Sequence, residues 1–178
     1  EAAWNEAIAK GVVNDSALWH AEKPRILTLL HNWLVDEIIN QQKWDYRPIA
    51  TEMKFFGKKT NPTIKLKLTD GFQVELEGAI DRVDSNGEKL FVTDYKLTSN
   101  SVPTSTAILQ AKDLQMDIYM LAAKKYMEKP VSGGGYYALN GLSRKRNLLF
   151  EDNGLMKMDR YNSSFASYDE FESSANLG

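Results

Sequence analysis

Two carboxylates and one amine in the stretch EGAIDRVDSNGEKLFVTDYKLTS, residues 77–99, have the types and spacing needed for metal chemistry. On an extended chain, alternate residues face the same way, so Asp94 and Lys96 share one side while Tyr95 points to the other. Asp81 lies in the preceding apolar segment, joined by a short turned link, and neighbouring strands lie about 4.8 Å apart. We therefore expect Asp81 and Asp94 to lie close together.

Two ionised carboxylates at this separation repel each other unless a cation lies between them, and oxygen ligands suit Mg²⁺. Such an ion polarises a phosphoryl oxygen and lowers the pKa of water, while a nearby amine orients that water or offsets developing charge. The arrangement therefore favours phosphodiester hydrolysis. The alternative is a pair of ordinary surface charges on a hairpin. Asp94 follows the apolar run Leu90-Phe91-Val92 after one intervening residue, which favours the metal site.

The spacing of Asp94 and Lys96 has little specificity by itself. At ordinary residue frequencies, about one acid-x-Lys match is expected in a chain of this length, and Glu52-Met53-Lys54 is a second one. The interpretation therefore depends on the elements that position these residues.

Hydrophobic periodicity predicts a helix over residues 24–44, with Pro24 in its first turn. It predicts a second helix over 106–127, closed off by Pro130 and Gly133–Gly135. The residues with strand-like patterns are 49–56, 63–69, 72–84, 89–95 and 135–140, followed by a short apolar run at 148–150. Turn residues between the first four strands predict an antiparallel meander. The polar residues 151–178 are expected to be a tail or the start of an element whose partner is missing.

Three motifs follow one another along these elements. Gly78 to Asp84 reads G-x-I-D-R-x-D, Asp94 to Lys96 reads D-Y-K, and the second helix carries Gln115 and Tyr119 as Q-x-x-x-Y. In this order they resemble the PD-(D/E)XK nuclease superfamily, in particular its RecB/AddB-like exonuclease branch. The resemblance covers roughly residues 50–125.

The resemblance implies an α/β, restriction-endonuclease-like fold with a mixed sheet of about five strands flanked by helices, as a single nuclease domain over residues 1–178. It also implies the site residues. The metal ligands would be Asp81, Asp94 and the Tyr95 carbonyl, and the catalytic group would be Lys96. Gln115 and Tyr119 would support the site and touch the DNA backbone, and Glu52 would be a supporting acid. Gln115 and Tyr119, four residues apart, share one helix face.

The same resemblance implies a DNA exonuclease that uses Mg²⁺ or Mn²⁺ in double-strand break repair and recombination. Its expected partners are DNA and a helicase subunit or helicase domain. AddB-type members also carry four cysteines around an iron–sulfur cluster, and this chain has no cysteine, so it cannot hold one. Family members usually carry an upstream histidine, but neither His20 nor His31 has the expected surroundings, and a structural role is expected for His31.

The amino-acid composition argues against two classes of protein. With 22 basic and 24 acidic residues, the chain lacks the global charge of a strongly basic nucleic-acid binder. It has no signal peptide pattern and no apolar run long enough to span a bilayer, so we expect a soluble, cytoplasmic protein without a membrane partner. The lack of an initiator methionine suggests part of a longer protein.

Two other functions stay open at this point. One is a catalytically inactive, nuclease-like DNA-binding or assembly module of a repair complex, favoured by the missing histidine and cysteines. The other is a hydrolase of a small phosphoester, which the lack of a Gly-rich phosphate loop disfavours.

Overall fold

The computed structural model describes residues 2–12, 16–42, 44–55, 64–67, 71–104, 107, 112–149 and 162–165. The chain divides into two compact units, Glu1–Ile38 and Ile39–Gly178. The first unit carries α1 (Ala2–Ala9) and most of α2 (Ala17–Gln41), while the described strands all belong to the second unit. Each candidate site residue named above also belongs to the second unit.

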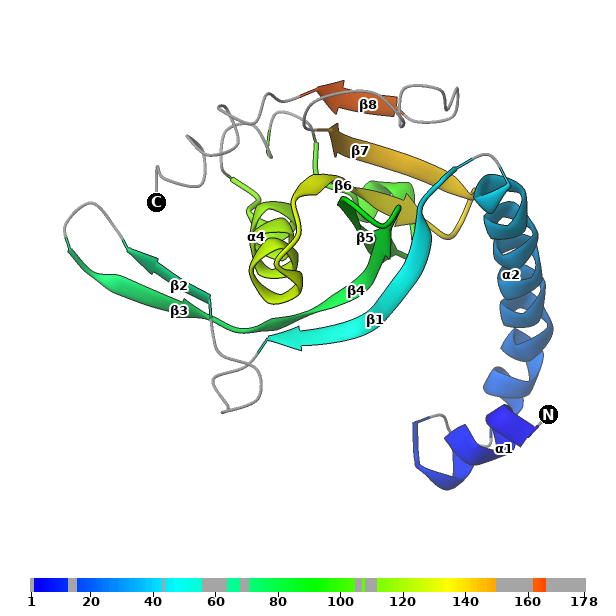
Figure 1. The fold of residues 1–178 in the computed structure, drawn as a ribbon. Helices are drawn as coiled ribbons and strands as arrows, with labels where there is room; N and C mark the ends of the chain where they lie inside the picture. The colour runs from blue at the N-terminus through cyan, green and yellow to red at the C-terminus, as the bar shows by residue number, and fades with distance from the viewer. Residues whose placement is uncertain are drawn as a thin grey trace. The chain divides into compact units, whose positions relative to one another are not determined.

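Within the described residues, six strands form one mixed sheet in the order β1-β4-β5-β6-β7-β8 (Figure 1). Their bounds are β1 Arg47–Phe55, β4 Gly78–Ser85, β5 Leu90–Lys96, β6 Val131–Ala138, β7 Ser143–Leu149 and β8 Asn162–Phe165. The pairs β5–β6 and β7–β8 are parallel, and the others are antiparallel. The predicted mixed α/β class is confirmed.

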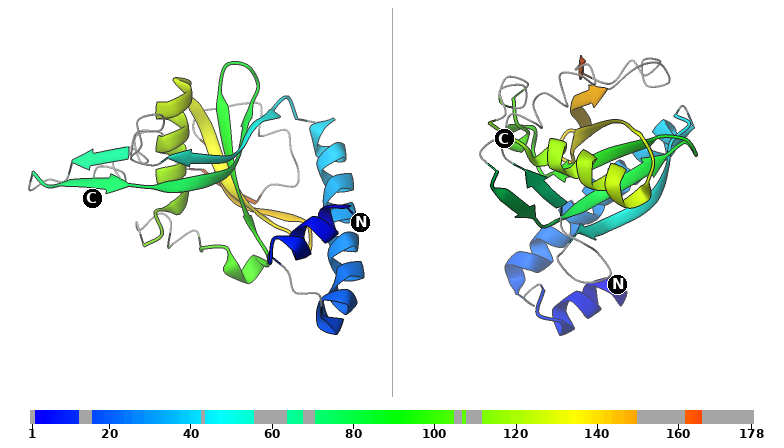
Figure 2. Two further views of the ribbon diagram at one scale, coloured as in Figure 1. Left: turned by 90° about the horizontal axis from the view of Figure 1, so that it is seen from below. Right: turned by 60° about the vertical axis from the view of Figure 1, so that its left-hand side comes forward.

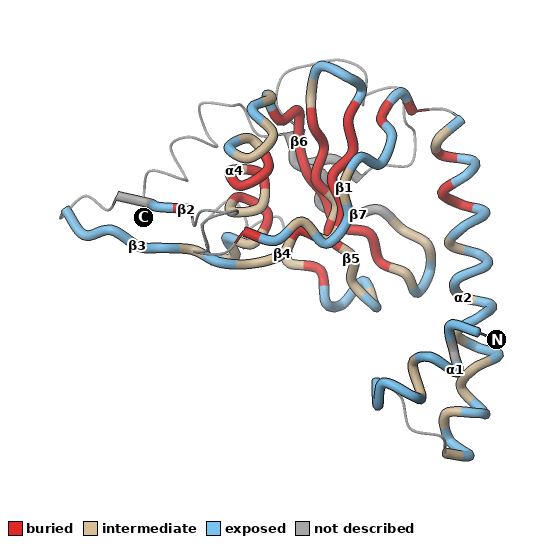
Figure 3. Tube along the Cα trace, turned by 60° about the horizontal axis from the view of Figure 1, so that its bottom comes forward, coloured by how far each residue is buried: buried red, intermediate tan, exposed pale blue. Residues whose placement is uncertain are grey.

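The connection from β5 to β6 contains the helix α4 (Gln115–Met127), because parallel neighbours need a long crossover rather than a tight turn. This helix packs against β4, β5 and β6 (Figure 2). We call the side of the sheet that it covers the α4 face. Figure 3 shows buried residues running along these three strands and the adjoining side of α4.

The close approach of α4 to the sheet depends on Gly134 in β6. A Cβ atom there would lie 2.5 Å from Met116 Sδ, which is closer than packed atoms allow, and 3.2 Å from Met120 Sδ, which is a tight contact. Gly134 therefore lets the two methionine side chains lie directly on the strand.

We expect Gly134→Val to lower the free energy of unfolding by about 1–3 kcal/mol, because overpacking forces side chains and backbone apart. Chemical denaturation of the two proteins would measure this loss. The control is Thr51→Val, which places the same side chain at an exposed position of β1. A Gly134→Val protein as stable as the unmodified one would contradict the close packing of α4.

The opposite side of the sheet, the far face, carries an aromatic group and a buried ion pair. Trp44 and Tyr46 pack around Phe91, with ring centroids 5.0 Å and 6.4 Å from it. Arg82 Nε lies 2.7 Å from Asp84 Oδ1, and both side chains are buried. The aromatic contacts join the segment before β1 to β5 on the side opposite α4, and the ion pair lies within β4.

The predicted antiparallel meander is correct in the pairing of β4 with β5 but wrong for the first strand, β1. The short strands β2 (Ile64–Lys67) and β3 (Gln73–Leu76) pair only with each other within the described residues, while β1 pairs with β4. The predicted strand 72–84 is thus two strands, separated at Glu77. Apolar alternation continues through this point, so the break depends on tertiary packing. A Cβ at Gly78 would lie 2.6 Å from Phe55 Cζ, so the glycine leaves room for that ring.

The predicted helix bounds also need correction. α2 begins at Ala17, so Pro24 lies inside the helix rather than in its first turn. α4 begins at Gln115, because Lys112 to Leu114 are not helical. Of the earlier part of the predicted helix, Ala107 is helical, and residues 105–106 and 108–111 lie outside the described part. The apolar spacing continues across both boundaries, so periodicity alone misplaces them.

At the other end of the crossover, Gly133–Gly135 belong to β6, which begins at Val131. These glycines were expected to close the helix, and they instead form the strand on which α4 rests. Of the predicted tail, 151–161 and 166–178 lie outside the described residues, and 162–165 form β8. In the part of the chain that the structure describes, no helix combines the length and apolar character needed to cross a membrane.

Candidate active site

The candidate site forms where β4 and β5 separate. Their backbone pairing ends at Arg82 and Thr93, and beyond this point the Tyr95 N–H donates to Asp81 Oδ2 at 2.8 Å instead of to the β4 backbone. The Asp81 carboxylate therefore satisfies a backbone donor at the opening between the strands. This contact holds the first predicted ligand beside the strand that carries the second.

Asp81 and Asp94 share the α4 face of the sheet. Val83 lies directly opposite Val92, and cross-strand partners project to the same face. Asp81 is two residues before Val83 and Asp94 is two residues after Val92, so both carboxylates also project there. This is the placement expected from the alternation of the sequence.

Tyr95 projects to the far face, as the alternation also predicts. Its hydroxyl accepts a hydrogen bond from Arg82 Nη1 at 2.9 Å, and its ring lies 5.9 Å from that of Tyr137 on β6. The Tyr95 side chain thus fixes the end of β5 from behind. Its backbone N–H donates to Asp81, whose side chain lies on the α4 face.

Asp94 is almost fully buried, with its side chain 4% exposed, and Lys96 Nζ lies 2.8 Å from its Oδ2. This oxygen accepts no well-aligned hydrogen bond, so the contact is chiefly one of charge. Burial raises the pKa of the Asp94 carboxyl above its ordinary value; Lys96 opposes this shift, while Asp81 and Asp113 add to it. Asp94 is thus a buried anion whose described neighbours only partly compensate its charge.

Lys96 is held by a short chain of hydrogen bonds from α4. Its Nζ donates to Gln115 Oε1 at 2.8 Å, and Gln115 Nε2 donates to Tyr119 Oη at 3.1 Å. The Tyr119 ring packs edge-on against Phe55, with centroids 6.2 Å apart. Gln115 and Tyr119 therefore lie on one side of α4, as their four-residue spacing predicts, and they reach the lysine.

Two residues that the sequence did not single out also belong to the site. Tyr136 lies beside Lys96, and Asp113 contacts the neighbours of Lys96. The amine lies 5.5 Å from the centre of the Tyr136 ring. Asp113 Oδ1 accepts hydrogen bonds from the Gln115 N–H at 3.2 Å and from the Tyr136 hydroxyl at 3.4 Å. An Asp just before a helix is a typical capping signal. Hydrophobic periodicity predicts a helix that begins at residue 106, so it places Asp113 inside the helix and misses this signal.

A further buried acid lies on α4 itself. Asp117 is 5% exposed, and burial raises the pKa of its carboxyl to about 6, with the nearby Asp113 adding to the shift. Because Asp113 also acts on Asp94, the negative charge beside the α4 face comes from both the sheet and the helix. The site is therefore electrostatically suited to a cation.

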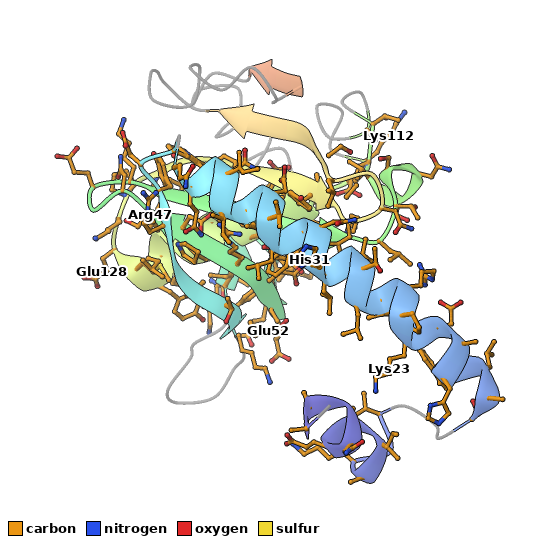
Figure 4. All side chains as sticks on the ribbon, turned by 90° about the vertical axis from the view of Figure 1, so that its right-hand side faces the viewer. Lys23, His31, Arg47, Glu52, Lys112 and Glu128 are labelled. Carbon is orange, nitrogen blue, oxygen red and sulfur yellow. The ribbon has the colours of Figure 1, made fainter. Side chains whose placement is uncertain are left out.

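The predicted supporting acid Glu52 lies between Thr51 and Met53, whose β4 partners flank Asp81, but it makes no described contact with this group. Glu52 lies on β1, is exposed, and has a positive φ of 50° (Figure 4). His20 and His31 both lie on α2. Among the described residues, no cluster of three or more His, Cys, Asp or Glu side chains is arranged to hold a metal ion. Any metal site here would contain the Asp81 and Asp94 pair without a third such side chain.

The donor set of this pair fits Mg²⁺ or Mn²⁺ better than a softer metal. Mg²⁺ keeps several waters and is commonly bound through one or two carboxylates plus substrate phosphate, so two carboxylates suffice. The Asp94 Oδ2 atom is buried and lies 2.8 Å from Lys96 Nζ, so a bound ion would share the Asp94 carboxylate with this lysine. The Tyr95 carbonyl is a further oxygen on the same stretch of β5.

Comparison with known proteins identifies the family of this chain. The family model described as the PD-(D/E)XK nuclease superfamily matches residues 1–175. The chain therefore belongs to the PD-(D/E)XK nuclease superfamily, which confirms the family predicted from the three sequence motifs.

The proteins that this chain resembles in sequence are longer. The chain is 37% identical over 89 residues to an ATP-dependent helicase/deoxyribonuclease subunit of Clostridioides difficile, covering 47% of this chain and 8% of that protein. Proteins of the same name match from Moorella thermoacetica, at 32% over 95 residues (50% and 8%), and from Desulforamulus reducens, at 26% over 132 residues (70% and 11%). The chain thus spans about a tenth of the length of these relatives.

Proposed function

We propose that the chain is the metal-dependent deoxyribonuclease domain of a helicase–nuclease and that it hydrolyses phosphodiester bonds in DNA. The observation that carries the proposal is the convergence of Asp81, Asp94 and Lys96 where β4 and β5 separate. The superfamily match supports a nuclease, and the names of the relatives support DNA as its substrate. Asp81, Asp94 and the Tyr95 carbonyl would hold Mg²⁺ or Mn²⁺.

Each part of the site has a separate role in this proposal. The bound ion would polarise a phosphoryl oxygen and lower the pKa of water. Lys96 would orient the attacking water and offset the negative charge that develops on the phosphate. The buried position of Asp94 keeps the Lys96 amine close to the reacting centre, because their charges attract strongly where water is excluded.

Gln115 and Tyr119 would act through Lys96 and at the DNA backbone. A free lysine side chain has several rotatable bonds, and the hydrogen bond to Gln115 Oε1 limits them to one direction. Tyr119 in turn limits the Gln115 carboxamide. In this proposal their remaining donors contact a phosphate of the bound strand. Glu52, exposed on the edge strand, has at most a supporting role.

The wider role follows from the relatives. Their names combine a helicase with a deoxyribonuclease, so we propose that a helicase subunit or helicase domain delivers DNA to this site. Such a nuclease would act as an exonuclease in double-strand break repair and recombination, in the cytoplasm of a bacterial cell. Residues 1–178 would serve as its single nuclease domain.

Cleavage of end-labelled linear DNA by the full chain tests the proposed function. We expect fragments with Mg²⁺ or Mn²⁺ and none in EDTA, because the bound ion would lower the pKa of the attacking water and polarise the phosphoryl oxygen. A chain that cuts equally well in EDTA would contradict the metal-dependent mechanism. Labelling either the 5′ or the 3′ end distinguishes the polarity of digestion.

An inactive DNA-binding or assembly module is the alternative function. The observation in its favour is that the described residues supply only a pair of acidic ligands and no cluster of three metal-binding side chains. The same assay separates the two functions. DNA binding with no cleavage under either metal would favour the module.

A further inference from the structure

Asp113 is the residue shared by two of the groups that surround Lys96. Lys96 has three described polar or aromatic neighbours, namely Asp94, Gln115 and Tyr136. Asp113 Oδ1 accepts hydrogen bonds from two of these, Gln115 and Tyr136. Asp113 itself is partly exposed and makes no described contact with the lysine.

The first of these hydrogen bonds fixes the start of α4. Backbone N–H groups in the first turn of a helix lack partners within the helix, and Leu114 at the cap position provides no side-chain acceptor. The Asp113 carboxylate accepts from the first helical residue, Gln115, at 3.2 Å. Because the Gln115 carboxamide extends from this same residue, its direction toward Lys96 depends on where the helix begins.

The second hydrogen bond holds the Tyr136 ring beside the Lys96 amine. Tyr136 is 1% exposed, and a buried hydroxyl requires a hydrogen-bond partner. Asp113 Oδ1 is the acceptor, at 3.4 Å. One carboxylate oxygen therefore links the start of α4 to β6 and sets the spacing between the two groups on either side of Lys96.

We propose that Asp113 is a positioning residue for DNA cleavage, acting through Gln115 and Tyr136 on the Lys96 amine. This inference rests on the proposed nuclease function. A positioning residue differs from a simple helix cap in what its removal does. Loss of a cap lowers stability alone, whereas loss of a positioning residue also moves the Gln115 carboxamide and slows the chemical step.

Three variants of the full chain separate these possibilities. Asp113→Ala removes both hydrogen bonds, Asp113→Asn keeps an acceptor oxygen of the same size, and Tyr136→Phe removes only the second bond. Glu88→Ala is the matched control, because it deletes an exposed acid at the β4–β5 turn, beyond the opposite end of β5 from Lys96.

We expect Asp113→Ala to lower kcat for DNA cleavage by about 10- to 100-fold with little change in KM, as for other residues that orient a reactive group. Asp113→Asn should recover most of the rate, and Glu88→Ala should match the unmodified protein. A change in KM alone, or no rescue by asparagine, would overturn the inference.

The side-chain amide resonances of Gln115 in ¹⁵N NMR spectra give a readout that needs no activity. They should shift in Asp113→Ala and Tyr136→Phe and stay in place in Asp113→Asn. If the unmodified chain cuts no DNA, the nuclease proposal fails while this shift still tests the positioning. Unmoved Gln115 resonances in both Asp113→Ala and Tyr136→Phe would contradict the role of Asp113. Should Asp113→Ala fail to fold, Tyr136→Phe alone decides in the same way.

Discussion

Lys96→Ala is expected to lower the rate of metal-dependent DNA cleavage by about a thousand-fold. Removing one group that stabilises charge in a transition state costs on the order of 100- to 1000-fold, and Lys96 would also orient the attacking water. The amine has no described replacement, because Gln115 and Tyr136 carry no positive charge. Single-turnover cleavage of labelled DNA at saturating protein would measure the effect on the chemical step.

Lys125→Ala is the control for this measurement. Lys125 is exposed in the last turn of α4, at the far end of the helix from Gln115. Its removal deletes the same charge and should leave the rate unchanged. Equal losses in the two variants would mean that lysine acts only through general attraction to DNA, and the catalytic role of Lys96 would then be wrong. Circular dichroism would establish that both variants are folded.

Asp94→Asn is expected to abolish both cleavage and stabilisation by metal, while making the metal-free protein more stable. A metal that binds only the folded state adds about 2.7 kcal/mol of stability at 100 times its Kd. An amide is a poor ligand for Mg²⁺ beside a single remaining carboxylate, so this gain should disappear. Thermal unfolding with EDTA and with Mn²⁺ would separate the two effects.

The gain without metal follows from the raised pKa of the Asp94 carboxyl. A carboxyl whose pKa is higher in the folded state than in the unfolded chain stabilises the fold at pH values below the unfolded pKa of about 3.9. This contribution is lost as the pH rises through the folded pKa. The advantage of Asp94→Asn should therefore be largest near neutral pH and should shrink as the pH falls toward about 4.

Asp45→Asn controls for the loss of one negative charge, because Asp45 is exposed and lies before β1. We expect it to retain cleavage and the Mn²⁺-induced rise in melting temperature. The metal assignment would be refuted by an Asp94→Asn protein that Mn²⁺ still stabilises as strongly as the unmodified chain. A metal-free Asp94→Asn protein that melts lower would instead show that the ion pair with Lys96 outweighs the cost of burying the carboxylate.

Local relationships in this site were predictable from the sequence. The two-residue period of a strand places Asp94 with Lys96 and directs Tyr95 to the other face, where its hydroxyl meets Arg82. The four-residue spacing of Gln115 and Tyr119 likewise predicts that they meet on one side of a helix. These relationships hold because they depend on the geometry of one element only.

Contacts between elements were harder to predict from the sequence. The sequence could suggest that Asp81 lies near Asp94, but not that Asp81 accepts the Tyr95 N–H where β4 and β5 separate. It predicted a meander, whereas β1 pairs with β4 across the intervening β2 and β3. Strand pairing of this kind depends on the packing of side chains far apart in the chain, which no local period records.

The sequence by itself therefore determined the family, the order of the motifs and the side chains that share a face. Only the tertiary structure decided that α4 begins at Gln115, and so that Asp113 is free of the helix and can join Gln115 to Tyr136 on β6. The physical reason is that periodicity reports which residues face the same way within an element. Where an element ends, and what it touches there, depends on the packing of α4 against the sheet.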